Sequence, residues 1–168
     1  MTNDVDFLKD FYIFKDLDQQ EIEFIAQIMA PRRYQEGDVI MKEGEPGESM
    51  YVISEGSVQI HKALTMKFGD DDFRETEKTL TVLRAEDHAV AGEMALITED
   101  KRSATVTALT ECLLYRITRD DFLGLAEKRP DLGFKVMHRL AKLVSQRLKK
   151  SGDDVIRLTT ALSIALSQ

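Results

Sequence analysis

The chain has 168 residues, which suits one domain or one domain with an extension. Hydrophobic residues make up 43% and charged residues 32%, a composition typical of a soluble folded protein rather than a disordered or membrane-embedded one. The net charge of −7 argues against a broad nucleic-acid surface, because phosphate backbones require a basic footprint. One small anionic ligand stays compatible, since a single arginine can bind a phosphate inside an acidic protein.

The single cysteine, Cys112, excludes an intramolecular disulfide and fits a reducing compartment. Residues 1–6 are polar and acidic, so no signal peptide is predicted. No apolar run approaches the length of a membrane span. We therefore expect a cytoplasmic protein that makes no contact with a membrane.

The first predicted element is a helix over residues 21–29. Its apolar side chains at 22, 25, 28 and 29 fall on one helical face, and Asp18 is placed to cap its N-terminus. Pro31 cannot continue the helix, so we expect it to end before that residue.

From residue 32 to 115, short β-rich runs alternate with glycines, a pattern typical of a sandwich or barrel. The clearest predicted strands are residues 50–53, 58–60, 79–83 and 104–109. Cys112 lies in another strand-like run and is expected in the core. The acidic stretch 69–72 is interpreted as a solvated loop between two strands; the alternative, a calcium site, lacks the order of acidic residues of an EF-hand loop.

Helical patterns return after residue 115. Thr118 can cap a helix over 119–127, and leucine and valine spacing predicts a second helix over 131–149. Ser151-Gly152 is interpreted as a stop signal, after which the pattern restarts. The tail 153–166 carries one apolar stripe, which a lone helix cannot bury. Its members are Val155, Leu158, Leu162, Ala165 and Leu166.

The residues with the clearest chemistry lie in 92–106, which reads GEMALITEDKRSATV. Gly92 and the amides after it open a short helical turn, where free N–H groups favour an anion. Glu93 can accept from a sugar hydroxyl, and Arg102 can donate two parallel bonds to phosphate oxygens. A capped surface turn is the alternative interpretation of these residues alone.

The whole pattern resembles the phosphate-binding cassette of the cyclic nucleotide-binding domain family. Gly92-Glu93-Met94-Ala95-Leu96 followed by Arg102-Ser103-Ala104-Thr105-Val106 carries the resemblance. Upstream, the segments 36–40, 43–53 and 55–58 are similar to that family's first strands and turns. The resemblance covers about residues 10–149 and is of the catabolite activator protein type, in its bacterial stand-alone form.

The resemblance implies an α+β fold: a jelly-roll-like β-roll, with N-terminal and C-terminal helices flanking it. The cyclic nucleotide-binding domain would span 10–149, and 150–168 would be an amphipathic helical tail. The ligand would be cAMP or cGMP, with no other cofactor. Glu93 would bind the ribose 2′-hydroxyl, Arg102 the cyclic phosphate, and Ser103 the phosphate or base.

Further ligand contacts implied by the resemblance are Gly92, Met94 and Ala95 in the cassette, and purine contacts from the long C-terminal helix. For the purine the candidates are His138, Arg139 and Lys142. Two positions depart from the family pattern. Ala91 stands where an aromatic residue is usual, and Lys101 where proline is frequent. Both departures are expected to loosen the cassette without removing a ligating group.

We therefore expect a cyclic nucleotide sensor that signals by movement of its C-terminal helices. The alternative is a protein-interaction module that keeps the fold without the ligand. No catalytic constellation supports an enzyme, and the scattered histidines His61, His88 and His138 lack metal-ligand spacing. The residues after 150 leave no room for a helix-turn-helix, so direct DNA binding is not expected. The apolar tail predicts a homodimer through the C-terminal helices, and a protein effector is a further possible partner.

Overall fold

The computed structural model describes residues 5–67 and 73–167, and the predicted acidic loop at 69–72 lies outside them. The helical elements are the α-helices α1 (Gln19–Gln27), α2 (Arg119–Lys128) and α3 (Pro130–Leu166), and the 3₁₀ helices η1 (Asp6–Asp10), η2 (Tyr12–Phe14), η3 (Ala85–Asp87) and η4 (Glu93–Leu96). The strands are β1 (Ala30–Tyr34), β2 (Val39–Met41), β3 (Ser49–Glu55), β4 (Ser57–Lys67), β5 (Phe73–Arg84), β6 (Val90–Ala91), β7 (Thr105–Ala108) and β8 (Cys112–Thr118).

The strands form two antiparallel four-stranded sheets, in the orders β1-β8-β3-β6 and β2-β7-β4-β5. Because successive side chains of a strand point to opposite faces, β3 serves two cores. Met50 and Val52 pack against the helices, whereas Tyr51 and Ile53 pack between the sheets. Cys112 lies buried in the core between the sheets, as predicted. The predicted α+β β-roll with flanking helices is confirmed.

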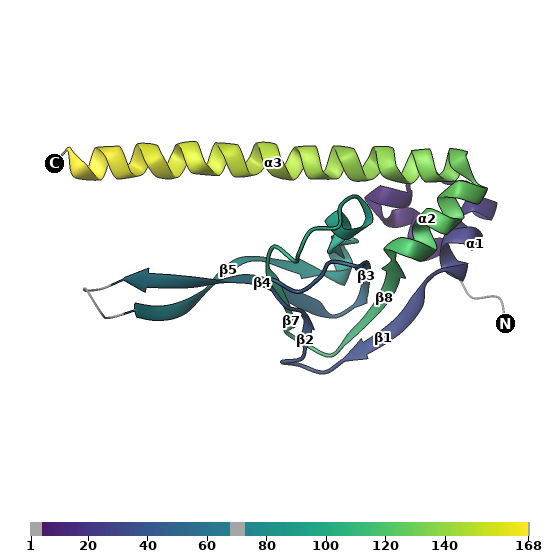
Figure 1. Ribbon diagram of the computed structural model, residues 1–168, viewed down its shortest axis with the longest axis horizontal. Helices are drawn as coiled ribbons and strands as arrows, with labels where there is room; N and C mark the ends of the chain where they lie inside the picture. The colour runs from purple at the N-terminus through teal and green to yellow at the C-terminus, as the bar shows by residue number, and fades with distance from the viewer. Residues whose placement is uncertain (1–4, 68–72, 168) are drawn as a thin grey trace.

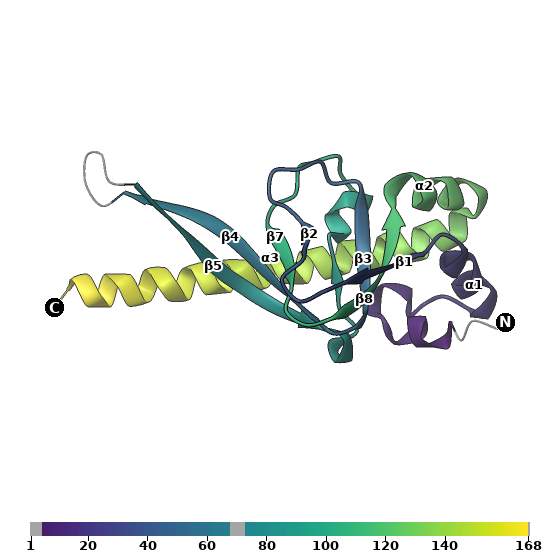
Figure 2. The ribbon, with the colours of Figure 1, turned by 90° about the horizontal axis from the view of Figure 1, so that it is seen from below.

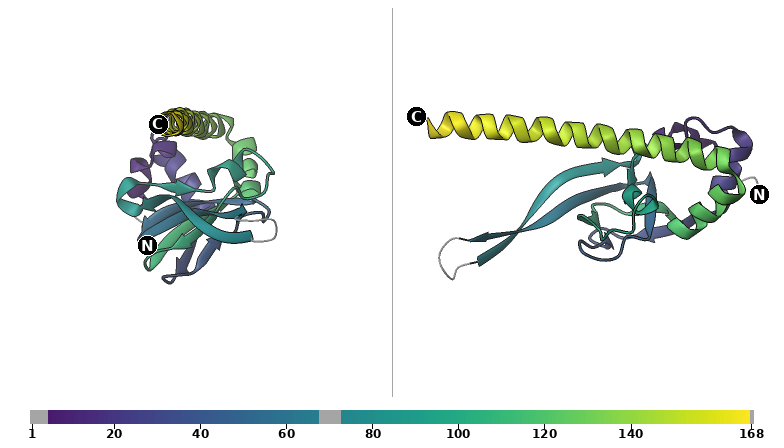
Figure 3. Two further views of the ribbon diagram at one scale, coloured as in Figure 1. Left: turned by 90° about the vertical axis from the view of Figure 1, so that its left-hand side faces the viewer. Right: turned by 45° about the horizontal axis from the view of Figure 1, so that its top comes forward.

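One side of this roll is covered by helices, namely the N-terminal helices, α2 and the long α3 (Figure 1). Helix α3 lies across the roll, and its C-terminal half extends past it in the same direction as the β4–β5 hairpin (Figure 2). The extended part of α3 and the β4–β5 hairpin are both seen from the side in the right-hand view of Figure 3. The inner face of α3 is buried through Leu132, Val136 and Leu140.

Helix α3 runs unbroken over 37 residues, so the predicted stop at Ser151-Gly152 is wrong. A glycine inside an exposed helix costs only about 1 kcal/mol relative to alanine, and no proline follows to enforce an end. The predicted helix 131–149 and the predicted helical tail are therefore one element. Pro130 occupies its first turn, where the missing N–H costs nothing.

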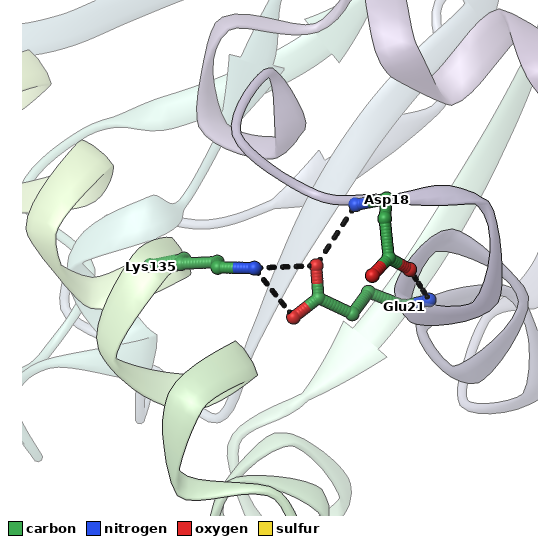
Figure 4. A network of polar contacts seen from close by, with 3 residues as sticks. All are labelled: Asp18, Glu21 and Lys135. Atoms are coloured by element: carbon green, nitrogen blue, oxygen red, sulfur yellow. Dashed lines mark hydrogen bonds and ion pairs between the residues drawn. The ribbon is translucent and has the colours of Figure 1, made fainter.

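Helix α1 begins with the predicted Asp18 cap. The Glu21 backbone N–H donates to Asp18 Oδ1 at 2.9 Å, and the Asp18 N–H donates to Glu21 Oε2 at 2.8 Å, which completes a capping box. The same Glu21 carboxylate accepts from Lys135 Nζ on α3 at 2.7 and 2.8 Å (Figure 4). This network therefore joins the start of α1 to the N-terminal third of α3.

We expect Asp18→Ala to lower the free energy of unfolding by about 1 kcal/mol, the usual contribution of a helix N-cap. Lys135→Met should have a smaller effect, because it leaves the cap intact and removes only a partly exposed ion pair. Urea unfolding of the two variants beside the parent measures both changes. An Asp18→Ala protein as stable as the parent would contradict the role given to the capping box.

Candidate functional site

The cassette begins where β6 ends. Gly92 adopts a left-handed backbone conformation, with φ of 72°, and turns the chain from β6 into η4. The Ala95 N–H donates to the Gly92 carbonyl at 3.0 Å, and this bond closes the first turn of η4. The predicted helical start after Gly92 is thus present as a single 3₁₀ turn, which carries Glu93 and Ala95 inward.

The end of the cassette is held by the turn between β2 and β3. The Arg102 N–H donates to the Glu45 carbonyl at 2.8 Å, and the Gly44 N–H donates to the Arg102 carbonyl at 3.0 Å. Gly47 N–H donates to Asp100 O at 3.2 Å, and a Cβ on Gly47 would lie 2.7 Å from that oxygen. These backbone bonds position Arg102 without using the N–H of Lys101, so proline and lysine are both compatible with them.

The Arg102 side chain is half-buried and directed into the site. Its Nη2 donates to the Ser49 carbonyl at 2.6 Å and lies 3.3 Å from Ser49 Oγ, while its Nη1 lies against Gly92. Burial lowers the pKa of the Arg102 guanidinium from its ordinary value. The side chain still carries its charge, because arginine does not deprotonate in proteins. A desolvated cation with unused donors is suited to an anion.

Glu93 lies opposite, with only 6% of its surface exposed. Its Oε1 accepts from Nη1 of Arg147 on α3 at 2.5 Å, and Nη2 of the same arginine is 3.4 Å from the Val90 carbonyl. A buried carboxylate requires such a partner, since an unpaired buried charge is costly. The pair thus ties α3 to the cassette.

Between these groups lies a cavity of about 140 Å³. Met41, Ile60, Ala91 and Val106 of the strands are among the residues that line it. The six predicted cassette residues all line it as well, namely Gly92, Glu93, Met94, Ala95, Arg102 and Ser103. The structure therefore brings the carboxylate of Glu93 and the guanidinium of Arg102, nine positions apart in the sequence, to one cavity with apolar side chains in its lining.

The three base-contact candidates do not line this cavity. Arg139 forms a two-pronged ion pair with Asp16 and lies over the Tyr12 ring, 4.8 Å from its centroid. His138 stacks on Phe134, with ring centroids 5.7 Å apart, and Lys142 is exposed. His138 and Lys142 lie on the exposed side of α3, whereas Arg139 is largely buried but faces Asp16 and Tyr12 of the N-terminal segment instead of the cavity. Their role as purine contacts stays a prediction.

Arg147 is the residue of α3 that does line the cavity, and the prediction missed it. A signal was present in the sequence. Arg147 follows Leu140 by seven positions and Leu143 by four, so it continues the inward stripe of the helix. A charged residue at an inward position of an amphipathic helix indicates a buried partner.

No helix within 5–67 and 73–167 is long and apolar enough to cross a membrane. Over the same residues, no group of three or more histidine, cysteine, aspartate and glutamate side chains is arranged to hold a metal ion.

A β-roll with such a cassette defines a class of nucleotide-binding domains, and comparison with known sequences agrees. Residues 31–129 match the cyclic nucleotide-binding domain family. This match covers more than half of the chain, and the chain belongs to that family.

Several named proteins are similar to it. The cyclic AMP receptor protein of Thermus thermophilus is 28% identical over 139 residues, which are 83% of this chain and 58% of that protein. Isozyme 1 of the cGMP-dependent protein kinase of Drosophila melanogaster is 35% identical over 128 residues, 74% of this chain and 15% of the kinase. This chain thus spans less than two thirds of each of these relatives.

Solved structures agree on the fold. The catabolite activator protein of Thermus thermophilus superposes with a TM-score of 0.72 at 27% identity, covering 88% of this chain and 63% of that one. The N-terminal domain of a transcriptional regulator from Streptomyces coelicolor A3(2) gives 0.69 at 28% identity, covering 89% and 94%. The predicted catabolite activator protein-like β-roll is confirmed.

Proposed function

We propose that this protein binds cAMP or cGMP in the cavity beneath α3 and reports the ligand by movement of that helix. The observation that carries the proposal is the pair Arg102 and Glu93, a desolvated cation and a buried carboxylate on the same pocket. Membership of the family and the likeness to a cyclic AMP receptor protein and a cGMP-dependent kinase support this class of ligand.

Each end of the ligand has a matching group. The cyclic phosphate carries one negative charge and two free oxygens, which suit the parallel donors of the Arg102 guanidinium. Ser103 adds a hydroxyl beside it. Glu93 can accept from the ribose 2′-hydroxyl, and a carboxylate acceptor makes that hydrogen bond about twice as strong as a neutral one. The lining of the cavity beside Glu93 is completed by Gly92, Met94 and Ala95.

Arg147 supplies the link from ligand to helix. The cavity is about 140 Å³, smaller than the roughly 300–1,000 Å³ of a typical small-molecule pocket. A nucleotide therefore requires some outward movement of the helix or of the Arg147 side chain. A ribose hydroxyl on Glu93 would meet the carboxylate that now accepts from Arg147. Ligand binding and the position of α3 thus depend on one carboxylate.

Isothermal titration calorimetry with cAMP and cGMP tests the proposal directly. We expect saturable binding of at least one of them, and thermal stabilisation by that ligand. A ligand that binds only the folded state adds about 2.7 kcal/mol at a hundredfold excess over Kd. AMP is the matched control, because it keeps the base and ribose but opens the phosphate ring. No heat and no thermal shift with either cyclic nucleotide would refute the proposal.

A 2′-deoxy cyclic nucleotide is expected to bind at least about tenfold more weakly than its ribo form. Loss of one hydrogen bond to a charged group costs roughly 1.5–3 kcal/mol. The comparison is made by calorimetry on the parent and on Glu93→Gln, in which the amide is a weaker acceptor. Equal affinity for the ribo and deoxy ligands in the parent would remove Glu93 from the ribose site.

One observation favours the second candidate, a protein-interaction module without a ligand. Glu93 already has a full partner in Arg147, so the site is electrostatically satisfied as it stands. In that case the ion pair between Arg147 and Glu93 only stabilises the fold, and neither cyclic nucleotide binds. We also propose that two copies of the chain associate through their C-terminal helices, because the large apolar side chains of α3 from Leu148 onward are exposed in the protomer.

A further inference from the structure

A second cavity lies where β8 runs into α2, a junction that can be followed in Figure 1. Its volume is about 220 Å³, and a single water molecule needs about 10–15 Å³ by the same measure, so a small polyatomic ion fits. The residues that line it are Glu48, Arg116, Thr118, Arg119 and Asp120. The cavity beneath α3 shares none of them, so the two cavities are distinct.

Arg116 has a buried donor without an acceptor. Over residues 5–67 and 73–167, its Nε is the one buried side-chain nitrogen or oxygen atom that lacks a hydrogen-bond partner. Such atoms are rare in folded proteins, because a buried donor without an acceptor has lost the hydrogen bonds that water gave it. An arginine side chain also stays charged, so the unused donor belongs to a cation.

The sheet fixes the position of this guanidinium. Strand β8 lies between β1 and β3, and Arg116 is in register with Ala30 on one side and with Tyr51 on the other. Both edges of β8 are therefore hydrogen-bonded, and the backbone at Arg116 cannot shift to carry the side chain into bulk water. An acceptor for the Nε atom has to enter from the cavity.

The charges around Arg116 favour an anion as that acceptor. The pKa of the Arg102 guanidinium is lowered by burial and, in addition, by repulsion from Arg116. On the other side, Nη1 of Arg119 donates to the Thr98 carbonyl at 3.3 Å, and its Nη2 lies 3.5 Å from Oε1 of the exposed Glu99. Arginine has five N–H donors, so both Arg116 and Arg119 keep donors for an oxyanion in the cavity.

The two carboxylates of the cavity select among oxyanions. Glu48 and Asp120 are exposed and line the same space as the arginines. An ionised carboxylate only accepts hydrogen bonds, so it repels an anion made of acceptors alone, such as sulfate. A hydrogenphosphate ion carries an O–H that can donate to a carboxylate, while its other oxygens accept from arginine. A phosphate monoester has mostly lost that O–H at pH 7.5, because its second pKa is about 6.

We infer that this cavity binds free hydrogenphosphate between Arg116 and Arg119, with Glu48 or Asp120 accepting from its O–H group. The ion supplies the acceptor that the Nε atom of Arg116 lacks. Binding here does not depend on a cyclic nucleotide, because the site uses no residue that lines the cavity beneath α3.

Thermal unfolding of the full chain at pH 7.5 and constant ionic strength tests the site, with inorganic phosphate as the probe. The midpoint of the parent should rise saturably, by about 3–6 °C at a tenfold excess over Kd. Sulfate and glycerol 3-phosphate should give less than half of this saturable rise. Exclusion of these anions from the protein surface also raises the midpoint, but that effect does not saturate.

Absence of a saturable rise with phosphate would overturn the inference. An equal saturable rise with sulfate would do so too, because the carboxylates would then select nothing. An equal rise with glycerol 3-phosphate would assign the cavity to phosphate monoesters instead of the free ion.

Arg116→Met removes the guanidinium at similar side-chain length and should abolish the saturable rise. Without phosphate this variant should be at least as stable as the parent, because the substitution removes a buried donor that has no acceptor. A purely structural role for Arg116 predicts instead an equal loss of stability with and without phosphate. Arg116→Lys keeps the charge without the planar guanidinium, so its Kd for phosphate should rise several-fold.

Two control variants locate the bound phosphate. Arg33→Ala removes an exposed arginine of β1 that lines neither cavity, and Arg102→Ala removes the cation of the cassette. Both should keep the phosphate-dependent rise in full. If Arg102→Ala abolishes the rise and Arg116→Met keeps it, phosphate binds in the cassette, and the second site is refuted while the proposed nucleotide site stands.

Discussion

Arg102→Ala is expected to abolish measurable nucleotide binding while the protein stays folded. The guanidinium is the cation directed into the cavity, and it is already desolvated and fixed on the Ser49 carbonyl. Removing one partner of a desolvated charge pair costs roughly 2–5 kcal/mol in binding. The loss in folding free energy should be about 1 kcal/mol, because the main-chain bonds that hold residue 102 remain. Calorimetry and urea unfolding on the same preparation separate the two effects.

Two control variants define what the guanidinium contributes. Arg102→Lys keeps the charge but loses the planar guanidinium that donates two parallel hydrogen bonds, so it should bind the nucleotide with intermediate affinity. Lys128→Ala removes an exposed cation that does not line the cavity and should bind within a few-fold of the parent. If Arg102→Ala binds either cyclic nucleotide as tightly as the parent, the phosphate does not lie at Arg102.

The cassette was predictable because its signals are local. The glycine that opens the turn, the short helical segment after it and the arginine ten residues after that glycine all lie within 92–103. The caps of α1 and α2 were predictable for the same reason, since Asp18 and Thr118 bond to amides three residues away. Strand positions followed from β-branched runs between glycines. For the two caps the bonding partner lies three residues away, and for the strands the signal is the composition of the strand itself.

The contacts that determine function across elements were not predictable in this way. Arg147 meets Glu93 over 54 residues of sequence, and Arg139 meets Asp16 over 123. Choosing among the cationic residues of α3 requires the rotation of the helix on the roll, and that rotation is set by packing of Val136 and Leu140. The end of α3 was misjudged because a glycine weakens a helix without ending it.

Gly92→Ala is expected to be the most damaging single-methyl change in the site. A side chain in the left-handed region costs about 1–2 kcal/mol. The new Cβ would also lie 2.7 Å from Arg102 Nη1, 2.9 Å from Met41 Sδ and 3.0 Å from the Ser49 carbonyl oxygen. Overpacking of this kind adds about 1–3 kcal/mol, so the free energy of unfolding should fall by roughly 2–5 kcal/mol.

Gly37→Ala separates the two causes. Gly37 has a φ of 89°, in the same left-handed region, but a Cβ there would meet nothing within 4 Å. Gly37→Ala should therefore lower the free energy of unfolding by only the backbone cost of about 1–2 kcal/mol and leave nucleotide affinity unchanged. Gly92→Ala should lose more stability and, in addition, lose affinity, because the methyl group displaces the guanidinium that binds the phosphate. Equal destabilisation of the two variants in urea, with affinity intact in both, would mean that Gly92 serves only its turn and that Arg102 does not depend on it.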